Sequence, residues 1–285
     1  MMRVRAGTGA RAGGAAGCGA RGLLAGLLAR GLGRRPARPA PPAGRRGREM
    51  AWRSHGTDNS SLVEALRRNG LVADARVEAA LLRVDRGHFV REPAEAYEDA
   101  PQTIGSAATI SAPHMHAHCL ELLEPFLPCG GAALDVGSGS GYLTAVLSRL
   151  VGPGGRAVGV DHVGGLVEWS KGNLRKDPEM AQRLETGALA VHEADGRKGW
   201  APGAPYDVIH VGAAAQAIPP ALVEQLKPGG RLVIPAGPEA GAQEMVVATK
   251  DAASGELQSE VVMGVRYVPL TDYAHQMQLA LRDRA

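Results

Sequence analysis

The chain has 285 residues, of which 45% are hydrophobic and 21% charged, enough for one sizeable core or at most two small ones. No apolar run approaches the roughly 20 residues needed to cross a bilayer. Three cysteines are too few for a disulfide framework, and 4% aromatic residues are too few for a surface that stacks single-stranded nucleic acid. These numbers exclude an integral membrane protein, a disulfide-built domain and that class of nucleic-acid binder.

The net charge of +3 averages two unlike regions of the chain. Residues 1–49 carry eleven arginines and a single acid, a charge of +10, so the rest of the chain carries −7. Because the main body is acidic, the basic isoelectric point is not a sign of nucleic-acid binding.

Residues 1–49 consist almost entirely of Gly, Ala, Arg, Pro and Leu. Such a composition buries too little apolar surface to offset the entropy of ordering the chain, so we predict that 1–49 is disordered and that one domain covers 50–285. An arginine-rich segment nearly free of acids suits a mitochondrial or plastid transit peptide. Equally, translation starting at Met50 would make it an inert extension, and both interpretations stay open.

In the first part of the body, helical spacing of apolar residues predicts helices over 59–71 and 74–86. A third helix is expected from Pro113, which suits a first helical turn, to the residue before Pro128. The stretch 89–112 between them is polar and broken by proline and glycine, so it is predicted to be irregular.

After residue 131, short apolar runs alternate with helical segments. Strands are predicted at 132–136, 156–161, 188–192, 206–211 and 231–235, with helices at 142–150, 163–174 and 219–226. Two further runs, 245–249 and 261–268, are expected to form an antiparallel pair at the end. This alternation predicts an α/β fold with a central, mostly parallel sheet and helices on both faces.

The strongest chemical signal is the segment Asp135-Val-Gly-Ser-Gly-Ser-Gly141, directly after the first of these strands. Its glycines permit a tight turn and a close approach to a ligand, and the helix that follows directs its unpaired N–H groups at that ligand. A dinucleotide fingerprint would need glycine at position 142, where the chain has Tyr142. The GxGxG pattern therefore favours S-adenosylmethionine over a pyrophosphate, with a purely structural turn as the alternative.

Two acids at the ends of the next two strands support a nucleoside site. Asp161 can accept hydrogen bonds from both ribose hydroxyls, and Asp195, followed by Gly196, can meet the adenine edge, because ligands of such sheets bind beyond the carboxyl ends of the strands. The alternative is that each acid caps a helix or a turn. Two acids in register with the glycine loop favour the nucleoside site.

Other chemistries fit less well. His114 and His118 are four residues apart, as in helical zinc pairs, but no carboxylate or thiolate completes the set, so we predict no metal and expect a helix start that closes over the cofactor. No GxSxG nucleophile motif is present. The fourth strand ends in His210-Val-Gly-Ala213, without the acidic or amide residue, two prolines and aromatic of amino-base methyltransferases. These small residues leave room for a peptide-sized acceptor.

Together these motifs resemble the protein-L-isoaspartate (D-aspartate) O-methyltransferase family. The matching pieces are 101–105 (PQTIG), 108–118, 134–141, 159–162 (GVDH), 195–197 (DGR), 206–215, 226–232 and 266–272, in that order across about 50–276. The start at Met50-Ala-Trp52 also resembles the family. The departures are Ala194, where many relatives have glycine, and the extension 1–49.

The resemblance implies a Rossmann-like class I methyltransferase fold, with N-terminal helices and C-terminal antiparallel strands. It implies an enzyme that moves a methyl group from S-adenosylmethionine to the free carboxyl of L-isoaspartyl and D-aspartyl residues in damaged proteins and peptides, leaving S-adenosyl-L-homocysteine. The ester then cyclises to a succinimide, whose hydrolysis returns some aspartate. The family is usually cytosolic and monomeric, and no nucleic acid or membrane partner is implied.

The resemblance also assigns site residues. It gives Ser111 the catalytic hydroxyl, for which a cap on the helix starting at Pro113 is the alternative role. A carboxylate acceptor is already ionised at neutral pH, so it needs alignment rather than a base. The implied cofactor-binding residues, including those of the glycine loop, are Ala108, Thr109, Ile110, Ser111, His116, Asp135, Gly137, Ser140, Gly141, Asp161, His162, Asp195, Gly196, Thr271 and Gln276.

Three rival functions stay open. The first is a methyltransferase of the same fold with another acceptor. The second is a cofactor-binding protein that has lost catalysis, against which the intact Ser111 and glycine loop argue. The third is a nicotinamide dehydrogenase, which Tyr142 disfavours.

Overall fold

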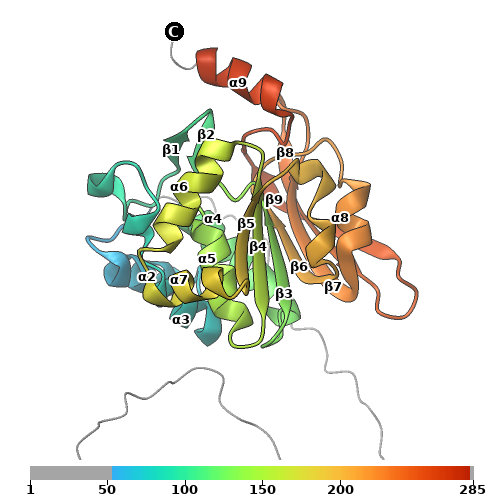
Figure 1. Cartoon of the computed structure of the whole chain (residues 1–285), viewed down its shortest axis with the longest axis horizontal. Helices are drawn as coiled ribbons and strands as arrows, with labels where there is room; N and C mark the ends of the chain where they lie inside the picture. The colour runs from blue at the N-terminus through green and yellow to red at the C-terminus, as the bar shows by residue number, and fades with distance from the viewer. Residues whose placement is uncertain (1–52, 283–285) are drawn as a thin grey trace, which may run out of the picture. The chain divides into compact units, whose positions relative to one another are not determined.

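The computed structural model describes residues 53–282 (Figure 1). The predictions for 1–49, of a disordered segment and of a transit peptide or inert extension, fall outside the described residues. Within 53–282, no helix combines the length and the apolar character needed to cross a bilayer.

Two short helices, α2 (Asn59–Arg68) and α3 (Ala75–Arg83), open the described chain, close to the predicted positions. Each begins at an aspartate: Asp58 accepts from the amide of Ser61, and Asp74 from those of the second and third helical residues. These side chains satisfy N–H groups that have no partner inside the helix. Two 3₁₀ turns follow, η1 (Arg86–His88) and η2 (Pro93–Glu95).

The stretch predicted to be irregular contains an antiparallel hairpin of β1 (Gln102–Gly105) and β2 (Ala108–Ile110). Its turn residues Ser106 and Ala107 have φ angles of 56° and 52°, a conformation that favours Gly or Asn. The prediction missed the hairpin because the residues at its turn are not those that signal one.

The central sheet has seven strands in the order β5-β4-β3-β6-β7-β8-β9. Their bounds are β3 (Ala132–Val136), β4 (Arg156–Asp161), β5 (Leu189–Glu193), β6 (Tyr206–Val211), β7 (Leu226–Ala236), β8 (Gln243–Lys250) and β9 (Leu257–Val265). The first five in that order are parallel, and β8 and β9 add an antiparallel end. The predicted mostly parallel sheet and the terminal antiparallel pair are confirmed, although β9 begins and ends earlier than predicted.

The remaining helices are α4 (Pro113–Leu123), α5 (Tyr142–Val151), α6 (Gly164–Leu174), α7 (Pro178–Glu185), α8 (Pro220–Gln225) and α9 (Tyr273–Arg282), with 3₁₀ turns η3 (Glu124–Phe126), η4 (Gly196–Lys198) and η5 (Ala201–Gly203). The prediction missed α7 and α9. In α7 only Met180 is fully buried, with Leu184 partly buried, and in α9 only Met277 packs against the core. Apolar faces this small give a weak sequence signal.

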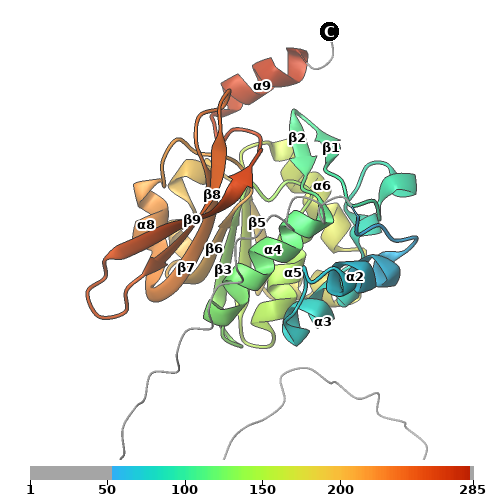
Figure 2. The ribbon, with the colours of Figure 1, turned by 180° about the vertical axis from the view of Figure 1, so that it is seen from behind.

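Alternate residues of the strands pack into two clusters on opposite faces of the sheet. In β3, Ala133 packs with α2 to α7, whereas Leu134 and Val136 pack on the face that α8 covers. Both ribbon views show the sheet between these two groups of helices (Figures 1 and 2). The prediction of helices on both faces is confirmed.

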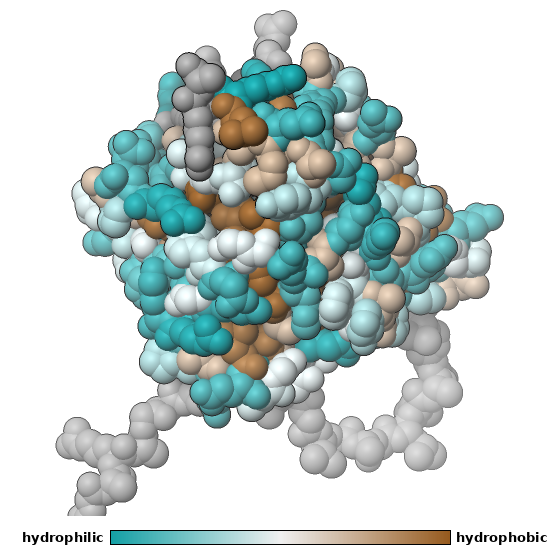
Figure 3. Space-filling model, turned by 45° about the horizontal axis from the view of Figure 1, so that its top comes forward, coloured by the Kyte–Doolittle hydropathy of each residue, from teal (hydrophilic) through white to brown (hydrophobic). Residues whose placement is uncertain are grey.

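The carboxyl ends of β3, β4 and β6 meet at one edge of the sheet, which we call the carboxyl edge. The β1–β2 hairpin and α9 lie at this edge, where the side-chain amide of Gln276 donates to the carbonyl of Ser106 at 2.8 Å. With these elements brought forward, apolar side chains gather in the middle of the face and hydrophilic ones border them (Figure 3). Ligand sites in open α/β sheets lie at such edges.

Candidate active site

The loop between β3 and α5 needs its glycines. Gly137, Gly139 and Gly141 have φ angles of 73°, 51° and 86°, which other residues adopt only with strain. A Cβ atom on Gly139 would also lie 3.0 Å from the side chain of Ile104 in the hairpin. Gly141 stands at the N-cap of α5 and supplies no side-chain hydrogen bond. Within the loop, the amides of Gly137 and Ser138 donate to the carbonyl of Val160, that of Gly139 to Asp161 and that of Gly141 to the carbonyl of Ser138. The amide of Ser140 and the N–H groups of the first turn of α5 are therefore the backbone donors that this loop can offer a ligand.

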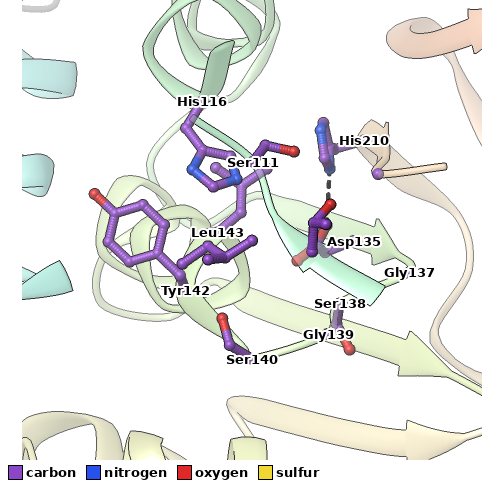
Figure 4. A pocket seen from close by; sticks show the side chains of 13 residues that line it. Ser111, His116, Asp135, Gly137, Ser138, Gly139, Ser140, Tyr142, Leu143 and His210 are labelled. Atoms are coloured by element: carbon purple, nitrogen blue, oxygen red, sulfur yellow. Dashed lines mark hydrogen bonds and ion pairs between the residues drawn. The ribbon is translucent and has the colours of Figure 1, made fainter. Parts of the chain in front are cut away.

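A cavity opens between this loop and the start of α4 (Figure 4). Seven predicted site residues line it: Thr109, Ile110, Ser111, His116, Asp135, Gly137 and Ser140. The other lining residues were not among the predicted site residues: Ser138, Gly139, Tyr142, Leu143, His210 and Gly212. Four of these six lie within or directly after the glycine loop, so membership of that motif was the available signal.

Asp161 lies beside the glycine loop rather than in the wall of the cavity. One carboxylate oxygen accepts from the amide of Gly139 at 3.0 Å, and the other from the amide of Val163 at 3.0 Å. Burial raises the pKa of Asp161, although these two amides oppose the rise. Asp161 thus stabilises the turn after β4 without capping α6, whose N-cap is Val163, and the same carboxylate connects the end of β4 to the glycine loop. Its contact with ribose hydroxyls stays a prediction.

Asp195 is turned toward a neighbouring arginine. It caps η4 through the amide of Arg197 and accepts from Nε and Nη2 of the same side chain, both at 2.9 Å. These hydrogen bonds lower the pKa of Asp195 despite partial burial. Gly196 has no room for a side chain, because a Cβ atom would lie 2.7 Å from Val136 at the end of β3. The segment is thus pressed against the carboxyl edge, while its acid does not line the cavity.

The remaining predicted residues surround the cavity without lining it. The side chain of Gln276 in α9 contacts Nε2 of His162, which follows β4, and also bonds the hairpin turn. Gln276 therefore joins α9, β4 and the hairpin. Three further predicted residues do not line the cavity either: Ala108, Gly141 and Thr271. Each lies within one or two residues of a segment that reaches the carboxyl edge.

A buried pair of side chains forms one wall. Nδ1 of His210 donates to Asp135 at 2.8 Å, and the other oxygen of Asp135 accepts from the hydroxyl of Thr144 at 2.6 Å (Figure 4). Burial alone would lower the pKa of His210, but the hydrogen bond to Asp135 and the neighbouring Cys119 raise it to about 9. The imidazolium and the carboxylate compensate each other's charge in a place from which water is largely excluded.

Ser111 lies between His116 and His210 in the cavity wall (Figure 4). The N-cap of α4 is Ala112, and no side chain caps that helix. The alternative role of Ser111 as a helix cap is therefore wrong. His116 is fully buried nearby, and burial, with Arg86, His210 and His114, lowers its pKa well below the usual range. The imidazole of His116 is therefore neutral at physiological pH.

Of the two histidines that suggested a metal, His114 has another partner, whereas Nε2 of His118 is buried without a hydrogen bond to any described residue. Nδ1 of His114 pairs with the buried carboxylate of Asp99 at 2.7 Å. Among residues 53–282, no group of three or more His, Cys, Asp or Glu side chains is arranged to hold a metal ion.

The residues present suit S-adenosylmethionine. The hydroxyl of Ser138 is buried at the cavity and finds no hydrogen-bond partner in the part of the chain that the structure describes. A buried hydroxyl without a partner is costly, so it is suited to bind a polar ligand. The amide of Ser140 adds a backbone donor and the buried carboxylate of Asp161 an acceptor at the same edge.

The sequence profile of the protein-L-isoaspartate(D-aspartate) O-methyltransferase family matches residues 57–275. The chain is 48% identical over 227 residues to a protein-L-isoaspartate O-methyltransferase of Caenorhabditis elegans, covering 80% of this chain and 98% of the relative. It is 50% identical over 220 residues to protein-L-isoaspartate O-methyltransferase 1 of Arabidopsis thaliana, covering 77% of this chain and 94% of the relative.

A solved structure is similar as well. It is described as a protein-L-isoaspartate O-methyltransferase from Plasmodium falciparum in complex with S-adenosyl-L-homocysteine. The TM-score is 0.69 at 32% identity, covering 76% of this chain and 99% of that one.

Proposed function

Because the chain belongs to the protein-L-isoaspartate(D-aspartate) O-methyltransferase family, we propose that its carboxyl edge holds S-adenosylmethionine against an isoaspartyl carboxylate. The chain is a protein repair methyltransferase with S-adenosylmethionine as cofactor. When bound, the cofactor supplies an electrophilic methyl group. The observation that carries the placement is the buried, unpartnered hydroxyl of Ser138 in a cavity formed by the glycine loop, Ser111 and His116.

The chain's own residues would bind the cofactor as follows. The amide of Ser140 and the hydroxyl of Ser138 lie in the cavity wall, where polar groups of the cofactor can meet them. Asp161 would exchange its bond to the Gly139 amide for ribose hydroxyls, or keep one of its two amide bonds and add them. Gly196 lets its segment pack closely against Val136 at the end of β3, which would bring the neighbouring Asp195 to the edge where the adenine is expected. Gln276 would close α9 over the bound cofactor from its position between His162 and Ser106.

The acceptor carboxylate is ionised at neutral pH, so these residues have no proton to remove from it. Ser111 would hold one carboxylate oxygen by a hydrogen bond and leave the other free to attack. The His210–Asp135 pair is neutral overall, so it neither repels the carboxylate nor captures it. Alignment of two bound groups accounts for most of the rate in such a reaction.

The test uses methyl-labelled S-adenosylmethionine and two peptides that differ only by isoaspartate or aspartate. We expect base-labile label on the isoaspartyl peptide alone. Label on both peptides, or on neither while the protein binds S-adenosyl-L-homocysteine, would contradict the proposed acceptor.

The assembly and the compartment are further proposals. We propose that residues 50–285 act as one monomeric methyltransferase domain in the cytosol, without nucleic-acid or membrane partners, and that 1–49 is an extension. Light scattering of the full chain tests the monomer. Mass spectrometry of the N-terminus in cells tests the compartment, because a cleaved 1–49 would favour an organelle.

A further inference from the structure

A guanidinium group lies buried behind the wall of the cavity. Arg86 is in η1, and none of its surface is exposed. Its Nε donates to the carbonyl of Ala96 at 3.1 Å, its Nη2 to the carbonyl of Ser111 at 2.9 Å, and its Nη1 approaches Nδ1 of His116 at 3.4 Å. Its partners in the described part of the chain are thus neutral acceptors, and two of the three belong to residues that line the cavity.

The charge of Arg86 is compensated only at a distance. Asp99 is the carboxylate that favours its charged form, but the oxygens of Asp99 are held by the amides of Ser54 and His114 and by the His114 ring. Burial lowers the pKa of Arg86 to about 10, so the side chain is charged at neutral pH. The ring of Tyr142, 5.4 Å from the guanidinium carbon, offers a further weak attraction. A buried cation without a directly bonded acid is expensive to maintain, which indicates a use for it.

This contact decides the tautomer of His116. A guanidinium has donors only, so Nδ1 of the ring must be the acceptor. A neutral imidazole with Nδ1 unprotonated carries its hydrogen on Nε2. Because His116 lines the cavity, the polar hydrogen that it can present there is the one on Nε2.

We propose that Arg86 is a positioning residue for methyl transfer, which fixes the Ser111 peptide and holds His116 as the Nε2–H tautomer, so that His116 donates to a carboxylate oxygen in the cavity. This proposal rests on the proposed function. The carboxylate belongs either to the aminoacyl part of the cofactor or to the isoaspartyl acceptor. In both cases the positive charge of Arg86, buried behind the cavity wall, favours the binding of an anionic group in the cavity.

The first test is independent of activity. Nitrogen-15 NMR of the histidine rings in the full chain reports which ring nitrogen carries hydrogen, with the His116 signals assigned by their loss in His116→Gln. We expect Nε2 protonated and Nδ1 unprotonated at pH 7. A proton on Nδ1, or a doubly protonated ring, would overturn the proposal whether or not the chain methylates peptides.

The second test removes the guanidinium group of Arg86, which donates to both His116 and Ser111. Arg86→Gln should give a mixed tautomer of His116, and Arg86→Lys, which keeps a charge but cannot reach both His116 and Ser111, should do the same. The matched control is Arg183→Gln, an arginine of α7 that donates to the carbonyls of Gly152 and Gly155 at the opposite end of the sheet and should leave the ring signals unchanged. An unchanged tautomer in folded Arg86→Gln would contradict the role.

Binding distinguishes the two carboxylates. If the carboxylate that His116 binds belongs to the cofactor, Arg86→Gln should weaken the binding of S-adenosyl-L-homocysteine about tenfold. The affinity for 5′-methylthioadenosine, which lacks that carboxylate, should stay unchanged. If the carboxylate belongs to the isoaspartyl acceptor, the KM for an isoaspartyl peptide should rise about tenfold, while the Kd for S-adenosyl-L-homocysteine stays unchanged. Equal weakening of both nucleosides, or no change in any of the three quantities, would show a merely structural arginine. If Arg86→Gln does not fold, the tautomer in the unmodified chain still decides.

Discussion

The two ends of the parallel strands use the same kinds of side chain in different ways. At the amino ends, Asp207 accepts from the amide of Ala132 at 2.8 Å and pairs with Lys227 at 2.7 Å, and Arg156 donates to backbone carbonyls. At the carboxyl ends, the Ser138 hydroxyl has no partner within 53–282 and Asp161 is buried between two amides. The polar groups named at the amino ends are paired with one another or with the backbone, whereas the carboxyl ends leave the hydroxyl of Ser138 for a ligand.

The largest expected effect tests whether Asp161 belongs to the ligand-binding end. Asp161→Ala should weaken S-adenosyl-L-homocysteine about 100-fold by calorimetry, because a charged acceptor for ligand hydroxyls is lost and the loop amide is released. Asp161→Asn, which keeps the shape and one acceptor, should lie between this variant and the unmodified chain. An intact affinity in Asp161→Ala would remove this residue from the site.

A substitution of Ser111, at the same carboxyl edge, should lower turnover without weakening cofactor binding. Ser111→Ala should lower kcat about 30-fold, because a hydrogen bond that orients the acceptor carboxylate is lost, while the Kd of the cofactor product stays within about twofold. Ser60→Ala, at an exposed position of α2, is the control and should change neither quantity. Unchanged turnover in Ser111→Ala would count against its catalytic role.

A substitution at the amino ends of the strands should lower stability and leave activity and cofactor binding unchanged. Asp207→Asn removes the ion pair with Lys227 and weakens the acceptor for the Ala132 amide, so the free energy of unfolding should fall by about 1 kcal/mol. Denaturant unfolding measures this loss, and kcat and cofactor Kd should remain unchanged. A fall in affinity without a loss of stability would mean that the two ends do not divide these tasks.

The buried His210–Asp135 pair should make stability depend on pH. His210 has a pKa raised to about 9, so its pairing with Asp135 contributes stability that is fully present below its unfolded pKa of about 6.5 and is lost as the pH rises through about 9. The difference in unfolding free energy between the unmodified chain and His210→Gln should therefore be larger at pH 6 than at pH 10. A difference that grows with pH would contradict the ion pair.

The fold was predictable to the extent that its signals are local. The glycine loop, the strand ends at Asp161 and the parallel alternation depend on neighbouring residues, and these predictions agree with the structure. The hairpin at Ser106 and Ala107 was missed because its turn lacks glycine. Helix α9 was missed because it has no fully buried residue and only Met277 packs against the core.

The site was predictable in position but not in orientation. Asp195 follows the expected strand, yet Arg197 holds its carboxylate. His210 pairs with Asp135, which lies 75 residues earlier in the sequence, so no local sequence pattern could predict that pairing. The buried contacts of Arg86 likewise join segments that meet only in the folded chain. Long-range packing, rather than residue type, decides which polar groups face a ligand.

The most direct test of the ligand-binding carboxyl edge is a crystal structure of the full chain with S-adenosyl-L-homocysteine. We expect ribose hydroxyls within hydrogen-bond distance of Asp161 and polar atoms of the ligand on the Ser140 amide and the Ser138 hydroxyl. A ligand bound away from this edge, or one that leaves Asp161 bonded only to the Gly139 and Val163 amides, would contradict the account.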